Sequence, residues 1–376
     1  MIIKTLETDG FKNLSNVKLD FHRNLNVFFG ENAQGKTNLI EAIWLCTGLK
    51  SFRGTKDRDF IGLEREAFHT ELCFEDKDRT QTISYNMSRN NLKEKAVFLN
   101  GVKLNSPSRL FSALNCVIFT PEDLDLSKGS PENRRRFLDL SVSQIKRSYV
   151  GVVNKYDSII NQRNKLLKDI ALGVSKKEDL EVWDEQLSKL GAYISVLRYA
   201  YTVKLNKVSS ALYSDITSGK EKLSLKLSST VFENLEGRND YGGEMYLEYL
   251  KKLRDKLDED IRLGFTQIGV HRDDLVTYIN GLPSREYGSQ GQNRSVALVL
   301  KLSQAYILSE ETKDSPVILL DDVLSELDTN RQEFVMSKIK NMQVFITCCE
   351  KNKINVLKDG SIFFVDGGVV KKIKRG

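Results

Sequence analysis

Two hydrophobic patterns alternate along the chain, and each predicts a different kind of element. Short apolar or alternating runs predict strands near both ends, and turn signals at Asn100-Gly101 and Asn280-Gly281 interrupt two of them. The predicted strands cover residues 2–7, 16–21, 25–29, 67–74, 80–87, 95–104, 115–119, 275–283, 317–320 and 344–349, with a final hairpin in the tail. The middle of the chain lacks this pattern.

Apolar residues in the middle of the chain recur at helical spacing instead. From residue 137 to 170 the spacing is mostly four and three, with an interruption at Arg163, and it resumes from 187 to 212 after a polar break. Two such stretches predict an antiparallel helical hairpin with arms of roughly 50 Å. A third helix is predicted at 245–261. The apolar stripes predict a helical core, with a partner-binding groove as the alternative.

Composition narrows the class of protein. The 376 residues are 40% apolar and 29% charged, which is typical of two or three compact lobes, and no stretch approaches the roughly 20 apolar residues of a membrane span. The first residues lack a signal-peptide layout, and none of the five cysteines forms a C-x-x-C pair. We therefore predict a cytoplasmic protein with reduced thiols and no membrane partner.

The segment after the apolar run at 25–29 has the spacing G-x-x-x-x-G-K-T and leads into a helix. Strand, glycine-rich loop and helix in this order are the context of a Walker A loop, in which backbone N–H groups surround a phosphate. Lys36 can reach the β- and γ-phosphates, and the Thr37 hydroxyl can ligate Mg²⁺. A glycine turn beside a surface lysine is the alternative. The predicted nucleotide-binding residues are Gly30, Glu31, Asn32, Ala33, Gln34, Gly35, Lys36, Thr37 and Asn38.

A second strand that ends in carboxylates has the pattern of a Walker B motif. Four apolar residues at 317–320 lead into Asp321 and Asp322. Ligands bind at the carboxyl edge of open α/β sheets, where Asp321 would hold Mg²⁺. Asp322 would orient or deprotonate the attacking water, so we predict Asp322 and Lys36 as the catalytic residues. The alternative is a strand that ends in an acidic turn.

A third motif begins a later helix. Ser289, Gln290, Gly291 and Gln292 are small or polar residues at a helix N-terminus, which is a second place to bind phosphate. Because Lys36 already serves the phosphates of one nucleotide, we expect this motif to act in trans on ATP bound to another copy. An N-cap with flanking glycines is the alternative.

Features of a nucleotide-binding loop therefore lie at both ends of the chain, with the helices between them. We predict an α/β fold split by an insertion. Residues 1–125 and 310–376 would form the ATPase lobe, and residues 126–309 a helical lobe that contains the hairpin and the Ser289–Gln292 motif.

These motifs, in this order, resemble the ABC-type ATPase heads of the SMC class and, within that class, the RecF family of recombination mediators. The likeness runs from end to end and also involves residues 28–43, 51–53, 129–132, 134–139, 269–274 and 324–328. The resemblance implies an ABC-type P-loop ATPase head that is split by a mainly helical insertion lobe.

The resemblance also implies a function. It implies ATP and Mg²⁺ as cofactors, ATP-driven homodimerisation with two nucleotides sandwiched between the copies, and weak, DNA-dependent ATP hydrolysis. The implied DNA is single-stranded or duplex, at gaps and at single/double-strand junctions, in replication and recombinational repair. RecR and RecO are the implied partners, and together with them the protein would support RecA loading.

The sequence departs from the ABC pattern at four places. Gln290 stands where glycine is usual, although the RecF family tolerates it, and Asp322 replaces the usual glutamate. Residues 345–349 contain no switch histidine, and residues 120–123 contain no Q-loop glutamine. Because these groups sense the γ-phosphate and place the water, we expect slow hydrolysis.

Basic residues suggest where DNA would bind. The net charge of +6 is compatible with nucleic acid. A polar loop at 48–62 and a cluster before the first long helix hold the candidate DNA contacts, for each of which a solvated charge is the alternative. The candidates are Arg53, Lys56, Arg58, Arg134, Arg135 and Arg136.

Three other classes of protein fit less of the sequence. A structural SMC-like tether would need a sustained long coiled coil. A transporter ATPase subunit would need a membrane partner and a switch histidine. A small-molecule P-loop kinase would leave residues 289–292 unexplained.

Overall fold

The computed structural model describes residues 1–92, 95–111, 113–349 and 360–374 and divides the chain into two compact units. The first unit combines Met1–Leu124 with Ala297–Gly376, and the second is Asp125–Val296. The second boundary lies inside one helix, α8 (Gln290–Thr312), whereas the sequence placed it at residue 310. Most of α8 therefore belongs to the first unit.

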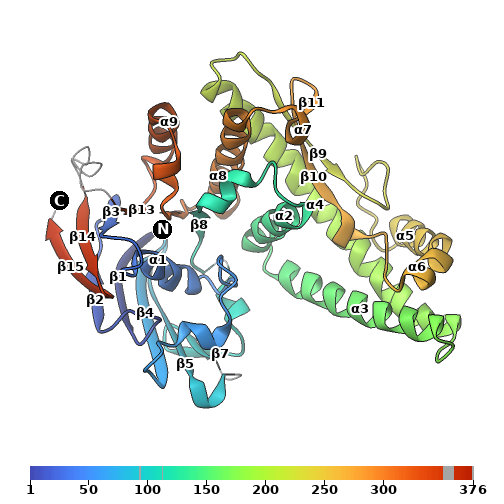
Figure 1. Cartoon of the computed structure of the whole chain (residues 1–376), viewed down its shortest axis with the longest axis horizontal. Coiled ribbons are helices and arrows are strands. Elements are labelled where there is room, and N and C mark those ends of the chain that lie inside the picture. The colour runs from blue at the N-terminus through green and yellow to red at the C-terminus, as the bar shows by residue number, and fades with distance from the viewer. Residues whose placement is uncertain (93–94, 112, 350–359, 375–376) are drawn as a thin grey trace. The chain divides into compact units, whose positions relative to one another are not determined.

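A six-stranded, mostly parallel sheet forms the centre of the first unit (Figure 1). Its strand order is β15-β14-β3-β13-β12-β8, and only β15 runs antiparallel to its neighbour. Strands β8 and β12 are buried at every position, as expected for a sheet covered on both faces. The strands are β3 (Leu25–Phe29), β8 (Cys116–Phe119), β12 (Val317–Leu320), β13 (Val344–Cys348), β14 (Ser361–Asp366) and β15 (Val369–Lys374).

A second sheet of the first unit is antiparallel, with the order β2-β1-β4-β5-β6-β7. Buried and more exposed side chains alternate along β5, so one face packs on the core. Its strands are β1 (Ile2–Asp9), β2 (Val17–Asp20), β4 (Ala67–Glu75), β5 (Thr80–Ser88), β6 (Ala96–Leu99) and β7 (Val102–Leu104). Helices α1 (Lys36–Leu45) and α9 (Thr329–Ile339) also belong to this unit, together with most of α8. The predicted strands are confirmed, including the turn at Asn100-Gly101, where both residues have positive φ.

The second unit is mainly helical. Its helices are α2 (Pro131–Ile145), α3 (Ser148–Ala171), α4 (Glu181–Ile216), α5 (Glu244–Asp255), α6 (Leu257–Leu263) and α7 (Ser284–Tyr287). A three-stranded sheet packs on α4 and consists of β9 (Leu223–Ser228), β10 (Asp274–Ile279) and β11 (Leu282–Pro283). The 3₁₀ turns in the described part of the chain are η1 (Asp57–Phe60), η2 (Arg89–Asn91), η3 (Pro107–Leu110), η4 (Pro121–Asp125), η5 (Lys177–Leu180), η6 (Val270–Arg272) and η7 (Val323–Glu326).

The predicted helical hairpin is present, but its details differ from the expectation. Helices α3 and α4 lie side by side (Figure 1), and with 24 and 36 residues they are about 36 and 54 Å long. The single helix predicted from 137 to 170 was wrong, because the chain becomes extended at Lys146 between α2 and α3. The third predicted helix likewise divides, at Lys256. Among the helices that the structure describes, none is long and apolar enough to cross a membrane.

The interruption of the apolar pattern at Arg163 marks a buried ion cluster. Arg163 is completely buried, and its guanidinium donates to Asp184 at 2.6 Å, to Asp260 at 2.7 Å and to Thr266 at 2.8 Å. Burial raises the pKa of Asp184, although the charge of Arg163 opposes the shift. This cluster joins α3, α4 and α6.

Arg163→Met should lower the free energy of unfolding of the second unit by about 3–5 kcal/mol, because it leaves two carboxylates buried without their cation. Lys177→Met is the control, since Lys177 and Asp258 form an exposed pair worth about 1 kcal/mol or less. Urea unfolding followed by the fluorescence of Trp183 in α4, in a Trp44→Phe background, measures both. Equal effects of the two substitutions would contradict the buried cluster.

Candidate functional site

The loop between β3 and α1 has the conformation that its glycines allow. Gly30 and Gly35 have φ values of 157° and 114°. A Cβ atom on Gly30 would lie 2.2 Å from the carbonyl oxygen of Val365 in β14, and one on Gly35 would lie 2.8 Å from the side chain of Asn13. Gly30 is therefore needed for space as well as for conformation, because the atom it approaches belongs to the backbone, whereas Gly35 is needed for its conformation.

Lys36 lies under this loop, at the first position of α1. Its side chain is buried, and its Nζ donates to the carbonyl oxygens of Gly30 and Glu31 at 2.8 Å each. The loop is also tied to the turn after β14, because the backbone N–H groups of Gly367 and Gly368 donate to Gln34. The loop thus places a cation beside a concave run of backbone.

The two predicted motifs meet at the carboxyl edge of the sheet. The Thr37 hydroxyl donates to Oδ1 of Asp321 at 2.9 Å, although the two residues are 284 positions apart. Thr347 on β13 donates to the same oxygen at 2.9 Å and accepts from the backbone N–H of Asp322 at 2.8 Å. Burial raises the pKa of Asp321, and the two threonine hydroxyls oppose this shift by stabilising the carboxylate. Asp322 has a left-handed backbone, with φ of 52°.

Cys349 ends the run 345–349, which contains no histidine. Its Sγ is 3.4 Å from Nζ of Lys36, and it donates to Oδ1 of Asn32 at 2.9 Å. The thiol that follows β13 therefore contacts the loop between β3 and α1. Residues 120–123, where a Q-loop glutamine was expected, contain none. There the backbone N–H and the hydroxyl of Thr120 donate hydrogen bonds to Asp123.

The Ser289–Gln292 motif begins α8 in the second unit. The Ser289 N–H donates to Oε1 of Gln292 at 2.7 Å, and the Gln292 N–H donates to Oγ of Ser289 at 3.2 Å. This reciprocal pair is a capping box. Ser289 and Gln290 are exposed, and Gly291 and Gln292 are partly buried, so the first half of the motif is open to solvent.

Sequence comparison identifies the family to which this arrangement belongs. Residues 2–370 match the model of the RecF/RecN/SMC N-terminal domain. The DNA replication and repair protein RecF of Lachnoclostridium phytofermentans is 38% identical over 374 residues, which cover 99% of this chain and 100% of that protein. The chain belongs to the RecF family.

Solved structures give the same result. A structure of the recombination mediator protein RecF–ATPrS in the RecFOR pathway is 35% identical to this chain, with a TM-score of 0.92. The match covers 99% of this chain and 98% of that chain. A second, of RecF–ATP, has a TM-score of 0.89 at the same identity and coverage. The predicted α/β fold class, an ABC-type P-loop ATPase head split by a mainly helical insertion lobe, is confirmed.

The residues predicted to contact DNA differ in their exposure to solvent. Arg53, Lys56 and Arg58 are exposed on the loop that follows α1. This loop is anchored by the buried carboxylate of Glu41, which accepts hydrogen bonds from Ser51 at 2.5 Å and Thr55 at 3.0 Å. In this RecF-family chain the basic loop is thus fixed to the helix that carries Lys36.

Arg134 does not suit a DNA contact. It is 2% exposed, and its guanidinium donates to both oxygens of Asp274, at 2.6 and 2.8 Å, and to the carbonyl of Gly129 at 2.7 Å. Arg135 is partly buried and donates to the carbonyl oxygen of Asp273 at 2.9 Å, while Arg136 is exposed. The prediction for Arg134 was wrong because its charge is neutralised inside the second unit.

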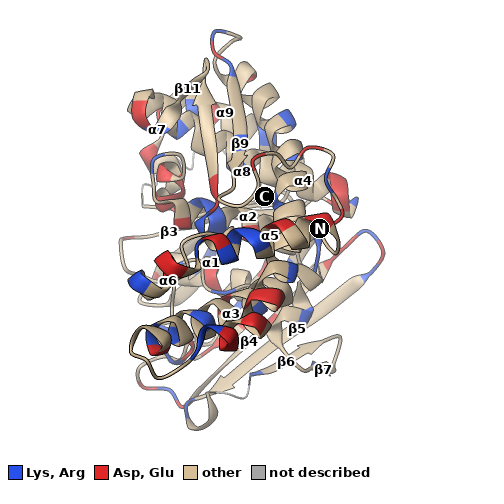
Figure 2. Cartoon of the chain, turned by 90° about the vertical axis from the view of Figure 1, so that its right-hand side faces the viewer, with Lys and Arg blue, Asp and Glu red and all other residues tan. Residues whose placement is uncertain are grey.

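Surface charge elsewhere on the second unit is mixed. Figure 2 shows Lys and Arg interspersed with Asp and Glu along α3, α5 and α6. Along α5 and α6, for example, the bases of KKLR are followed directly by the acids of DKLDEDIR. Such faces are typical of solvated helices and not of a nucleic-acid groove.

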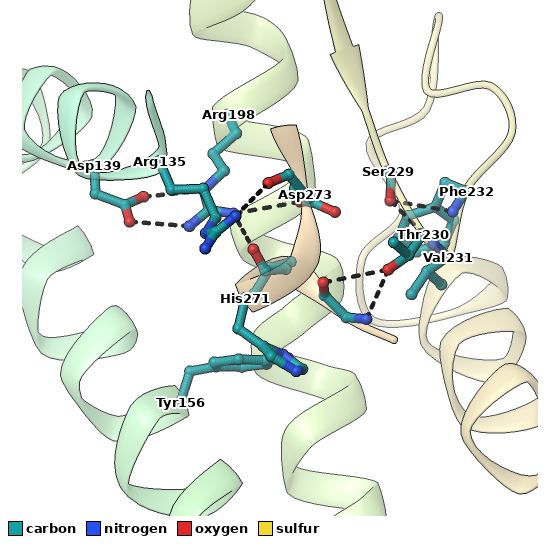
Figure 3. Close-up of polar contacts among 12 residues, drawn as sticks. Arg135, Asp139, Tyr156, Arg198, Ser229, Thr230, Val231, Phe232, His271 and Asp273 are labelled. Carbon is teal, nitrogen blue, oxygen red and sulfur yellow. Dashed lines mark hydrogen bonds and ion pairs between the residues drawn. The ribbon is translucent and has the colours of Figure 1, made fainter. Parts of the chain in front are cut away.

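A buried polar network surrounds residues 269–274 (Figure 3). Arg198 on α4 donates to both oxygens of Asp139 at 2.9 Å and to Oδ2 of Asp273 at 3.3 Å. His271 lies beside the hydroxyl of Tyr156, 3.0 Å away. Burial raises the pKa of Asp273 to about 6, which Arg198 opposes, and burial lowers the pKa of His271 to about 4.

Sequence reasoning missed several residues of the site. Thr347 follows the apolar run of β13 as Asp321 follows that of β12, so its place at the end of a strand was the available signal. Glu41 is a lone acid on the predominantly apolar helix α1, which is a signal of a buried charge. Asn13 carried no comparable local signal.

Asp273→Asn should make the second unit more sensitive to acid. The folded pKa of Asp273 is raised, so its protonation stabilises the fold as the pH falls from about 6 to 4. The folded pKa of His271 is lowered, so its protonation destabilises the fold as the pH falls from about 6.5 to 4. Each contribution is on the order of 3 kcal/mol, so the two offset one another in the wild type.

Without the Asp273 carboxyl, the His271 contribution is unopposed. The free energy of unfolding should then fall by about 3 kcal/mol more between pH 7 and pH 4 than it does in the wild type. Urea unfolding at a series of pH values, followed by Trp183 fluorescence, measures the difference. Parallel pH profiles would contradict these pKa shifts.

Proposed function

We propose that the protein binds ATP and acts as an ATP-dependent, DNA-binding recombination mediator in the cytoplasm. The observation that carries this proposal is the 2.9 Å contact between Thr37 and Asp321, because it joins the glycine-rich loop to the second motif at one edge of the sheet. The solved RecF structures with ATPrS and ATP support the same ligand for this chain.

The donor set at this edge fits Mg²⁺. The Thr37 hydroxyl and the Asp321 carboxylate are hard oxygen ligands, and among the described residues there is no group of three or more His, Cys, Asp or Glu that could hold a metal alone. Such a pair suits an ion that takes its other ligands from phosphates and water. When bound, Mg²⁺ would neutralise charge on the β- and γ-phosphates.

The chain's own residues would divide the remaining work. Gly30–Asn38 would surround the phosphates with backbone N–H groups, and Lys36 would exchange its contacts with Gly30 and Glu31 for phosphate oxygens. Asp322 would orient the attacking water. Its side chain is shorter than glutamate, and residues 345–349 contain no switch histidine, so both features support weak hydrolysis. The dependence of this hydrolysis on DNA is part of the proposal through the family resemblance.

ATP would also bring two copies together. The Ser289–Gln292 motif would contact the γ-phosphate of ATP bound to the other copy, so that ATP favours the homodimer. The dimer would bind DNA at gaps and single/double-strand junctions through phosphate contacts by Arg53, Lys56, Arg58 and Arg136. With RecR and RecO it would support RecA loading, in keeping with the RecFOR pathway of the solved relatives.

Lys36→Met should weaken ATP binding by roughly 100-fold or more, because it removes a charge-assisted contact to the phosphates. A titration with a fluorescent ATP analogue measures the affinity. Lys340→Met, at an exposed lysine of the same unit, is the matched control and should bind ATP as the wild type does. Wild-type affinity of Lys36→Met would refute the site.

Binding to gapped DNA in the presence of ATP should weaken linearly with the logarithm of the salt concentration, because Lys and Arg displace counterions from phosphates. Replacing both Lys56 and Arg58 by Gln should lower the steepness of that line by about 2, roughly one for each lost contact. Fluorescence anisotropy over a salt series measures the slope. A flat salt series would remove the electrostatic account, and an unchanged slope would exclude these two residues.

A further inference from the structure

The exposed residues of the Ser289–Gln292 motif rest on a buried amide. Asn293 follows the motif directly and is 3% exposed. Its Nδ2 lies within hydrogen-bond distance of three carbonyl oxygens, those of Ser284 at 3.1 Å, Gly288 at 2.9 Å and Ser289 at 3.0 Å. One side chain therefore holds the backbone that enters the motif.

The other end of this amide is fixed as well. Oδ1 of Asn293 accepts a hydrogen bond from the buried Ser127 hydroxyl at 2.8 Å. The backbone around Ser127 is held in turn by Arg134, whose Nη1 donates to the carbonyl oxygens of Gly129 at 2.7 Å and Ser127 at 3.4 Å. Asp274 clamps the other edge of the Arg134 guanidinium. The support thus runs through buried side chains from β10 to the start of α8.

Space around Gly288 shows how closely the amide fits. A Cβ atom on Gly288 would lie 2.7 Å from Nδ2 of Asn293 and 2.5 Å from the carbonyl oxygen of Ser284. The φ of Gly288 is −77°, which any residue adopts, so glycine is needed here for space. A side chain at this position would displace the amide.

The side chain of Gln292 adds a second constraint. It forms the capping box with Ser289, and its Nε2 donates to Oε1 of Glu221 at 2.6 Å. Tyr213 on α4 donates to the other oxygen of Glu221 at 2.7 Å. Ser289 therefore has a fixed position although it is exposed.

We propose that Asn293 is a positioning residue that sets the geometry of the Ser289–Gln292 motif for ATP bound to a second copy, with Ser127 and the Arg134–Asp274 pair as its support. This inference rests on the proposed function and adds to it the residues that preorganise the contact. A phosphate contact depends on donor placement within a fraction of an ångström, so loosening the backbone at Gly288 and Ser289 weakens it without any change in the chemical groups.

The inference predicts different effects on two properties of the full-length protein, its affinity for ATP and its ATP-dependent dimerisation. The Walker A residues all lie in the first unit, whereas Asn293 lies in the second. Asn293→Ala should keep the affinity for a fluorescent ATP analogue within about twofold, but weaken ATP-dependent dimerisation by about tenfold or more. Ser127→Ala, which removes one contact to the amide and leaves Asn293 in place, should weaken dimerisation in the same direction by less. Sedimentation velocity with a non-hydrolysable ATP analogue measures dimerisation.

Two further variants serve as the negative and the positive control for dimerisation. Ser289→Arg, which blocks the motif directly, should abolish dimerisation with nucleotide binding intact. Asn164→Ala is the matched control, because Asn164 also holds backbone in the second unit, by accepting from the Thr266 N–H at 2.8 Å, and this backbone is not that of residues 284–293. It should dimerise as the wild type does.

The outcomes distinguish this inference from the proposed function. A wild-type protein that stays monomeric with the ATP analogue would overturn the proposed function and the inference with it. If the wild type dimerises and Ser289→Arg does not, the inference is overturned when Asn293→Ala and Ser127→Ala both dimerise normally. It is also overturned when Asn164→Ala loses dimerisation equally, because the effect would then be general destabilisation of the unit.

Discussion

The hydrogen bond between Thr37 and Asp321 depends on strand order more than on any single residue. β13 pairs with β3 on one side and with β12 on the other, and the pairing places Val344 opposite both Leu25 and Ile318. The same register continues to the carboxyl ends, so Thr347 near the end of β13 and the segments that follow β3 and β12 gather at one edge. Thr37, Thr347 and Asp321 meet there because the sheet brings three distant segments together.

The second unit is organised by buried arginines instead of by a sheet. Arg134, Arg163 and Arg198 are each at most 3% exposed, and each is paired with carboxylates from other elements. Removing such charges from water is costly, so only an arrangement that pairs them all is tolerated. Apolar stripes alone permit several ways of packing long helices. An arrangement that brings each of these arginines to its carboxylates is favoured over one that leaves them unpaired.

Local sequence patterns were sufficient to predict elements whose structure depends on neighbouring residues. The run before Gly30 and the run before Asp321 predicted β3 and β12, and the glycine spacing predicted the loop, because each depends on neighbours in the chain. The breaks at Lys146 and Lys256 were missed because helical spacing continues through both positions. Arg134 was misread because its partner Asp274 is 140 residues away, and a cluster of arginines predicts a charged surface when its partners are unknown. Asn293 had no signal of its own beside the motif that precedes it.

The position of β3 has a consequence for how the protein is made. Both of its neighbours, β13 and β14, come from residues beyond 340, so the apolar segment LNVFF has no strand on either side while the ribosome adds some three hundred further residues. An unpaired apolar strand is a site of aggregation. The nascent polypeptide must therefore keep this segment shielded, by chaperones or by its own early antiparallel sheet, until translation is almost finished.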